Sequence, residues 1–217
     1  MAEKSIVVLI SGSGSNLQAI IDAIASGQIN GRIAAVLSNK TGVLGLERAD
    51  KAGIPQIAIS HKDFEDRESF DAAMMEAIDA HSPDLIVLAG FMRILTPEFV
   101  RHYQGRMFNI HPSLLPKYKG LHTHQRALEA GDKQHGCTVH FVTEELDGGP
   151  LAIQAPIDIL ATDNEDSLQQ RIHSSEHKIY PLAVEWFCAD RLKLPVSGAV
   201  QLDGDNLPPE GYQFIQE

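Results

Sequence analysis

The sequence predicts an α/β domain with a doubly wound, mostly parallel sheet and antiparallel strands in its carboxyl-terminal part. Three observations predict this class. Continuous apolar runs of strand length alternate with helical patterns over the first hundred residues, as in sheets buried on both faces. A glycine-rich loop joins the first apolar run to the first helical pattern. Beyond residue 136 the pattern changes to alternation, which is typical of antiparallel strands.

Each element of the first half has its own signal. The apolar runs predict strands at residues 6–10, 33–37, 56–59 and 85–89. Helical spacing predicts helices at residues 16–26, 45–52 and 67–81. Gly27, Gly53 and Pro83 lie near the helix ends, where residues that stop a helix are expected.

Thr96-Pro97-Glu98 predicts the capped start of a short helix. A strand is predicted after this helix, and Pro112 is expected to end it. Alternation predicts strands within residues 137–143 and 151–159. Residues 166–192 predict a long amphipathic helix, interrupted or bent around Pro181. The tail predicts a short hairpin at the sheet edge, around residues 203–206. Since no repeat or linker appears, we expect one domain.

Composition excludes several classes of protein. The chain has 29 acidic and 18 basic residues, a net charge of −11, which argues against a nucleic-acid-binding surface. No stretch approaches the roughly 20 apolar residues of a membrane span, and the amino-terminal apolar segment is too short for a signal peptide. Cys137 and Cys188 belong to no paired motif, so we expect reduced thiols in a cytoplasmic protein.

The segment Asn109-Ile110-His111-Pro112 is the strongest chemical signal. Side chains two apart on a strand point to the same face, so Asn109 and His111 would share one pocket wall. An amide donor and a titratable ring at a strand end suit a reaction that builds negative charge on oxygen. The alternative is a strand that ends in a polar loop, which we would favour for His111 alone but not for the pair.

The glycine loop, residues 11–16, favours a phosphate site. Backbone amides at the start of a helix bind anions. Leu17 stands where a dinucleotide fingerprint needs its third glycine, and no acidic residue closes the second strand to hold a ribose. A single phosphate, as on a phosphorylated sugar, is therefore the better interpretation, and a simple chain-reversing turn is the alternative.

Other polar residues leave two interpretations open. Asp147, before Gly148-Gly149, is either a plain turn residue or a carboxylate that orients an imidazole. Arg67 and Asp71, one helical turn apart, are either a surface ion pair worth at most about 1 kcal/mol or part of a clamp for a ligand carboxylate. Glu176 is by default a solvated helix residue. We expect no metal, because the sequence lacks H-E-x-x-H and cysteine pairs, although histidines cluster at positions 122, 124, 135, 140, 173 and 177.

These segments together resemble the phosphoribosylglycinamide formyltransferases, the folate-dependent enzymes of purine synthesis. The resemblance covers nearly the whole chain, through LISGSGSNLQAII, SNK, GLERA, LAGFMRIL, NIHPSLLPKYKGLHTHQRALEAGD, HGCTVHFVTEELDGGP, EHKIYP and GYQF. The wider formyltransferase superfamily shares only the Asn-x-His and Leu-Asp-x-Gly elements, so KGLHTH and the glycine loop carry the narrower resemblance. The chain departs from the family at Ser13, at Lys119 and at residues 173–175.

The resemblance implies a Rossmann-like formyltransferase fold in one domain, 1–217, with a phosphate-binding half, 1–100, and a folate-binding and catalytic half, 101–217. It implies a catalytic trio of Asn109, His111 and Asp147. It places ribonucleotide binding on Gly14, Ser15, Asn16, Leu17, His173, Ser174, Ser175 and Glu176. It places folate binding on Arg67, Met92, Arg93, Ile94, Leu95, Asn109, Thr143, Glu144, Glu145, Leu146 and Asp147.

The implied reaction transfers the formyl group of the co-substrate 10-formyltetrahydrofolate to the amine of phosphoribosylglycinamide, without a metal, in a monomer or weak homodimer. Alternatives are a formyltetrahydrofolate hydrolase with the same trio, and a non-catalytic module that binds a sugar phosphate or folate. A formyltransferase acting on initiator methionyl-tRNA would carry a basic extra domain, which this acidic chain does not supply.

Overall fold

The computed structural model describes residues 2–196 and 198–215 and consists of two compact units. Unit 1 is Met1–Asn109 and unit 2 is Ile110–Glu217. The boundary falls inside one strand, β5 (Met107–His111). No helix in the described ranges is long and apolar enough to cross a membrane.

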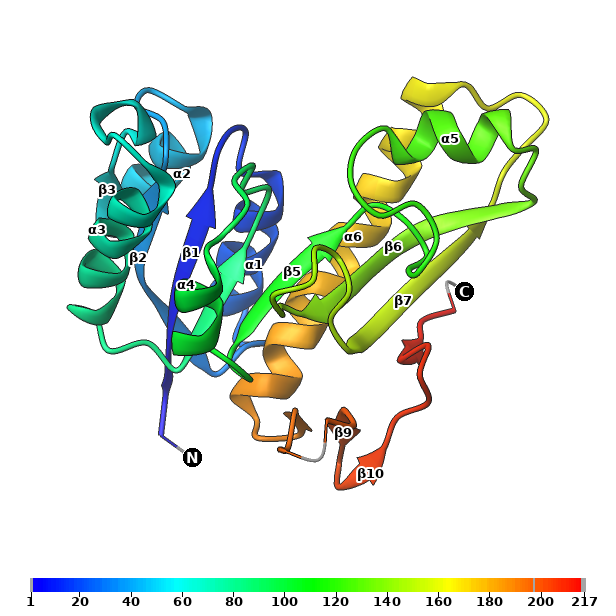
Figure 1. The fold of residues 1–217 in the computed structure, drawn as a ribbon. Helices are drawn as coiled ribbons and strands as arrows, with labels where there is room; N and C mark the ends of the chain where they lie inside the picture. Colours follow the sequence, from blue (N-terminus) through cyan, green and yellow to red (C-terminus); the bar gives the residue numbers. More distant parts are fainter. Residues whose placement is uncertain (1, 197, 216–217) are drawn as a thin grey trace. The chain divides into compact units, whose positions relative to one another are not determined.

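Unit 1 is a parallel sheet with interleaved helices (Figure 1). Its strands lie in the order β5-β4-β1-β2-β3, and every pairing among them is parallel. In chain order the elements before β5 are β1 (Lys4–Ile10), α1 (Ser15–Ala25), β2 (Gly31–Ser38), α2 (Leu44–Lys51), β3 (Gln56–Ala58), η1 (His61–Asp63), α3 (Arg67–Asp79), β4 (Leu85–Leu88) and α4 (Pro97–His102).

The core of unit 1 follows from its apolar runs. Residues 6–10 of β1 are fully buried, because this central strand has β4 on one side and β2 on the other. The predicted helices begin and end within two residues of the observed ones. Gly27 and Gly53 have positive φ after α1 and α2, the conformation in which glycine commonly ends a helix. Thr96 caps α4 by accepting a hydrogen bond from the Phe99 amide.

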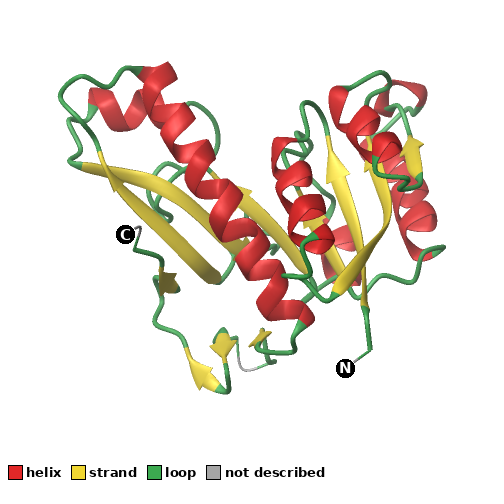
Figure 2. Cartoon of the chain, turned by 180° about the vertical axis from the view of Figure 1, so that it is seen from behind, coloured by secondary structure: helices red, strands yellow, loops and turns green. Residues whose placement is uncertain are grey.

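Unit 2 is built on an antiparallel pair, β6 (Gln134–Phe141) and β7 (Leu151–Asp158). The long helix α6 (Glu165–Cys188) packs across both strands (Figure 2). The remaining elements are α5 (Thr123–Glu129), β8 (Leu192–Lys193), β9 (Gln201–Leu202), β10 (Asp205–Asn206) and β11 (Tyr212–Gln213). With parallel strands in unit 1 and antiparallel β6 and β7 here, the predicted fold class is confirmed.

Two details of the carboxyl-terminal part differ from the sequence prediction. Helix α6 is not interrupted at the buried Pro181, because one missing backbone donor costs less free energy than the burial of the helix's long apolar face contributes. The predicted hairpin exists as β9 and β10, but it pairs with β8 in a separate three-stranded sheet. The strand added beside β7 is instead β11, which was not predicted.

Candidate active site

Strand β5 carries Asn109 and His111 near its carboxyl end, as predicted. Met107 and Phe108 anchor the strand in the core, and Leu88 of β4 pairs with Asn109. The strand ends directly before Pro112, which cannot donate to a sheet ladder. The local fold thus delivers two polar side chains at the end of a buried strand.

The imidazole of His111 forms a hydrogen bond with a main-chain carbonyl. Its Nε2 lies 2.8 Å from the oxygen of Tyr118, and the residue is only 6% exposed. Because a carbonyl oxygen can only accept, Nε2 must carry the hydrogen in this contact. Nδ1 is therefore the ring nitrogen that remains for a reacting group.

The carboxylate of Asp147 faces this nitrogen. Its Oδ2 lies 3.5 Å from Nδ1 of His111 and accepts a hydrogen bond of 2.9 Å from the Gly120 amide. Asp147 has a positive φ of 48°, so the turn before Gly148 bends sharply where the carboxylate emerges. The structure thus brings together His111 and Asp147, which lie far apart in the sequence.

Residues 118–120 hold both groups. The Tyr118 carbonyl contacts His111 and the Gly120 amide contacts Asp147. Arg126 of α5 donates a hydrogen bond of 2.8 Å to the carbonyl between them, that of Lys119, and its guanidinium lies over the Tyr118 ring. Sequence reasoning missed these contacts, because backbone acceptors and donors leave no residue-type signature.

A second histidine lies on the other side of Asp147. Nε2 of His140 is 3.9 Å from Oδ1 of Asp147, and Nδ1 of His140 is 3.0 Å from the Phe141 carbonyl. Burial lowers the pKa of His140, so the ring is neutral at neutral pH. Nδ1 then donates to the carbonyl, and Nε2 lies on the side of the ring that faces Asp147.

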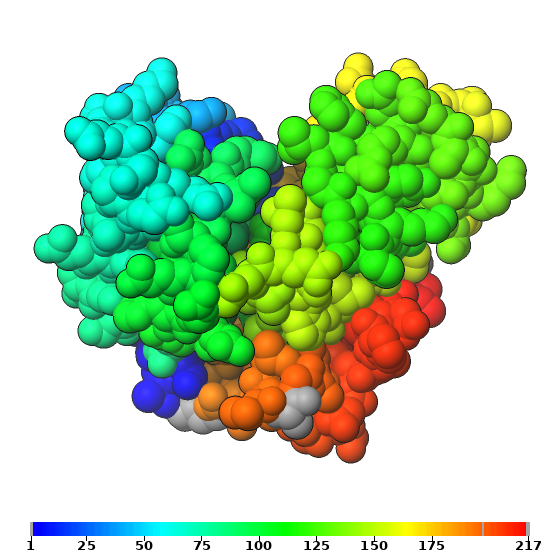
Figure 3. Space-filling model, in the orientation of Figure 1, coloured from blue at the N-terminus to red at the C-terminus, as the bar shows by residue number. Residues whose placement is uncertain are grey.

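The turn that leads to Asp147 stands at the surface of unit 2. Residues around Glu145 form the yellow-green projection in Figure 3, and Leu146 is exposed. Lys119 Nζ lies 2.6 Å from Oε1 of Glu145, which joins this turn to residues 118–120. A Cβ at Gly149 would run into the Phe141 carbonyl, so only glycine fits there.

The glycine loop of unit 1 ends at Gly14, the N-cap of α1, with a φ of 69° and no side-chain cap. The first turn of α1 contains no acidic residue, so its amide end suits an anion. Gly14 also has a packing role: a Cβ there would lie 2.6 Å from the Cα of Gly45 in α2. A turn that needs positive φ and close packing against α2 would by themselves require glycine at position 14, whether or not a phosphate binds there.

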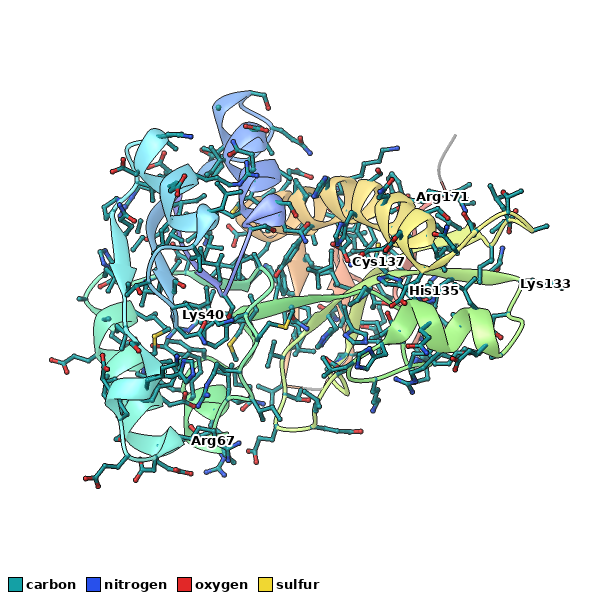
Figure 4. All side chains as sticks on the ribbon, turned by 90° about the horizontal axis from the view of Figure 1, so that it is seen from above. Lys40, Arg67, Lys133, His135, Cys137 and Arg171 are labelled. Carbon is teal, nitrogen blue, oxygen red and sulfur yellow. The ribbon has the colours of Figure 1, made fainter. Side chains whose placement is uncertain are left out.

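Arg67 and Asp71 do not form the surface ion pair that was weighed. Arg67 is the exposed first residue of α3 and extends from the periphery of unit 1 (Figure 4). Asp71 is 1% exposed and accepts a hydrogen bond of 2.6 Å from the Thr96 amide. The segment 92–95 follows β4 without regular structure, and Met92 is 67% exposed.

Helix α6 carries the predicted residues 173–176. The hydroxyls of Ser174 and Ser175 donate to carbonyls one turn earlier in their own helix. Glu176 is buried, so the default assignment as a solvated residue is wrong. Burial raises the pKa of the Cys137 thiol, and the nearby Glu176 raises it further.

The remaining histidines include a buried pair. Nδ1 of His124 lies 3.2 Å from Nε2 of His135, and burial is the main cause that lowers both pKa values to about 4. Figure 4 shows His135 and Cys137 on the same strand, β6. Within residues 2–196 and 198–215, no group of three or more His, Cys, Asp or Glu side chains could hold a metal ion.

Comparison with known proteins connects this geometry to a family. The formyl transferase family model matches residues 4–184. The chain is similar to phosphoribosylglycinamide formyltransferase of Escherichia coli, with 56% identity over 208 residues that cover 96% of this chain and 98% of the relative. The corresponding protein of Haemophilus influenzae is 50% identical over 209 residues, 96% of this chain and 98% of the relative.

Among solved structures, the chain is similar to the phosphoribosylglycinamide formyltransferase from Coxiella burnetii, in complex with CHES. The TM-score is 0.94 and the identity 51%, over 98% of this chain and 99% of that chain. The family model covers most of the chain and the relatives match along almost their whole length. The chain therefore belongs to the formyl transferase family and, within it, to the phosphoribosylglycinamide formyltransferases.

Proposed function

We propose that this chain transfers the formyl group of 10-formyltetrahydrofolate to the amine of phosphoribosylglycinamide in de novo purine biosynthesis. The products are formylglycinamide ribonucleotide and tetrahydrofolate. One observation carries the proposal: a buried His111 whose Nε2 contacts the Tyr118 carbonyl while Nδ1 faces Asp147. The relatives named above support the choice of substrates.

The proposed chemistry is a direct attack without a covalent enzyme intermediate. The glycinamide nitrogen forms a bond to the formyl carbon, and the carbonyl oxygen becomes an oxyanion. The bond from that carbon to N10 then breaks, and the proton lost by the amine passes to N10. Asn109 and His111 project from one face of β5, where both would donate hydrogen bonds to the oxyanion.

Asp147 orients the ring of His111 in this proposal. Because Nε2–H already donates to the Tyr118 carbonyl, the ring donates to the oxyanion through a hydrogen on Nδ1, and the Asp147 carboxylate lies 3.5 Å from that nitrogen. The neutral His140 lies on the other side of the same carboxylate. A water between these groups would carry the proton from the amine to N10.

Ligand binding is assigned by position and by the family. We assign the substrate phosphate to the start of α1, where Gly14, Ser15, Asn16 and Leu17 present backbone amides. The ribose and glycinamide end is assigned to the segment of α6 formed by His173, Ser174, Ser175 and Glu176. The folate is assigned to Arg67, to residues 92–95, to Asn109 and to residues 143–147.

We expect the reaction to take place in the cytoplasm, without a metal and with small molecules as the only partners. The acidic net charge and two free buried cysteines, Cys137 and Cys188, are consistent with this assignment. A monomer or weak homodimer remains our expectation for the assembly.

A single assay tests the proposal against its alternatives. The protein is mixed with 10-formyltetrahydrofolate, with and without phosphoribosylglycinamide, and released tetrahydrofolate is followed by absorbance while the product is identified by mass. We expect turnover only when both substrates are present. Formate release without the acceptor would establish the hydrolase instead, and ligand binding without turnover would establish the binding module.

A further inference from the structure

The segment from Met92 to Thr96 connects β4 to α4 without regular structure of its own. Met92 and Ile94 are 67% and 58% exposed, as expected of a surface loop. Nevertheless, the backbone amides at its two ends are bound by side chains of Ser11 and Asp71, which come from distant parts of unit 1.

At the first end, the hydroxyl of Ser11 accepts a hydrogen bond of 2.8 Å from the Met92 amide. The same hydroxyl donates to Oδ1 of Asn39, at 2.6 Å. Ser11 is 4% exposed and Asn39 is similarly buried. Because its donor and acceptor functions are both used, the hydroxyl has one orientation, and Ser11 fixes Met92 to the glycine loop.

At the second end, Oδ2 of Asp71 accepts a hydrogen bond of 2.6 Å from the Thr96 amide. Oδ1 of Asp71 is buried and has no hydrogen-bond partner in the described part of the chain. Burial raises the pKa of this carboxyl, while the Thr96 contact and the nearby Arg67 and Arg93 act in the opposite direction. The Arg93 guanidinium lies 5.3 Å from the centre of the ring of Phe70, the residue that directly precedes Asp71.

We propose that Ser11 and Asp71 are positioning residues for folate recognition, holding the Met92–Thr96 backbone at both ends in its binding conformation. This inference rests on the function proposed above, which assigns residues 92–95 to the folate. A loop held before the ligand arrives loses less conformational entropy on binding, so the two anchors increase folate affinity. Neither side chain needs to touch the reacting atoms.

The first test replaces Ser11 with alanine, which leaves the Met92 amide without its acceptor. Affinity for 5,8-dideazafolate, a non-reactive folate analogue, is measured by fluorescence titration. We expect a loss of roughly 5-fold to 100-fold, which corresponds to the usual cost of leaving a partly buried donor without its acceptor. The KM for phosphoribosylglycinamide should rise less than the analogue affinity falls, because the phosphate is assigned to residues 14–17 and not to Ser11 itself. Ser26→Ala, which removes a hydroxyl that donates to the Ala23 carbonyl within the same helix end, is the matched control and should change neither value.

The second test separates the hydrogen bond of Asp71 from its charge. Asp71→Asn keeps an oxygen that accepts from the Thr96 amide, so analogue affinity should stay near that of the wild type. Asp71→Ala removes the acceptor and should weaken binding roughly 10-fold, within the same range as the Ser11 variant. Equal losses in the two variants would show that charge, rather than anchoring, is what Asp71 contributes, and would overturn its proposed role.

A third measurement does not depend on activity. Hydrogen exchange of the Met92 amide should be faster in Ser11→Ala than in the wild type, and unchanged in Ser26→Ala. Thermal unfolding confirms that each variant is folded. The inference is overturned if Ser11→Ala and Asp71→Ala are folded and bind the analogue as the wild type does, or if phosphoribosylglycinamide affinity falls equally. A wild-type protein that binds no analogue would instead refute the proposed function before any variant is compared.

Discussion

Nε2 of His111 lies 2.8 Å from the carbonyl oxygen of Tyr118, seven residues later in the chain. This contact requires a hydrogen on Nε2 and leaves Nδ1 facing Asp147 at 3.5 Å. The reacting geometry of the histidine therefore depends on the conformation of a loop, residues 118–120, as much as on strand β5.

Arg126→Gln should lower kcat roughly 10-fold to 100-fold, because a displacement of reacting groups by about 1 Å is enough for such a loss. The guanidinium bonds the Lys119 carbonyl at 2.8 Å and covers the Tyr118 ring, so its loss releases the loop that holds His111. Steady-state kinetics give kcat and both KM values. Gln125→Ala is the control, because the Gln125 amide donates to Glu129 one helical turn later and not to residues 118–120 in the described structure. An unchanged kcat in Arg126→Gln would exclude a positioning role.

Gly14→Ala should destabilise the protein more than Gly27→Ala. Both glycines have positive φ, 69° and 79°, so each alanine carries a backbone strain of about 1–3 kcal/mol. A Cβ at Gly14 would also lie 2.6 Å from the Cα of Gly45, whereas nothing lies within 4 Å of a Cβ at Gly27. Urea unfolding of both variants measures the difference. Equal losses would mean that α1 and α2 separate easily at this contact.

The buried pair His124 and His135 should make the protein less stable in mild acid. Each has a pKa of about 4 in the folded state, below the ordinary 6.5 of the unfolded chain. Between these values the unfolded chain binds more protons, so the free energy of unfolding falls as pH decreases from 6.5 to 4. The slope is at most about 1.4 kcal/mol per pH unit for each histidine. His135→Gln should reduce this slope, measured by urea unfolding at pH 7, 6 and 5; the wild-type slope in the variant would contradict the assignment.

Much of the fold was predictable because it rests on side-chain patterns. The buried β1 and β4 are continuous apolar runs, and Pro112 ends β5 as expected. The short strands of the tail were harder to predict. β8 and β11 contain two residues each, too few for an apolar pattern to indicate a strand.

The residues of the candidate site likewise fall into those that the sequence predicts and those that it does not. Asn109, His111 and Asp147 stand out because their residue types carry chemistry. Tyr118 and Gly120 act through backbone atoms, which the sequence does not distinguish from those of any other residue. Glu176 was misjudged, and the burial of Asp71 was not foreseen, for another reason: charged residues on helices are mostly exposed, and only the tertiary structure shows that these two are buried.

The most direct test of the account is the turnover of His111→Ala and Asn109→Ala with both substrates at saturation. We predict that kcat falls roughly 10²–10⁴-fold for His111→Ala, the range for a lost acid–base group. For Asn109→Ala we predict about 10²–10³-fold, the range for a lost oxyanion donor. Binding of 5,8-dideazafolate to His111→Ala should stay within about 3-fold of the wild type. A kcat near that of the wild type in His111→Ala would contradict the central claim that this imidazole stabilises the reaction's oxyanion.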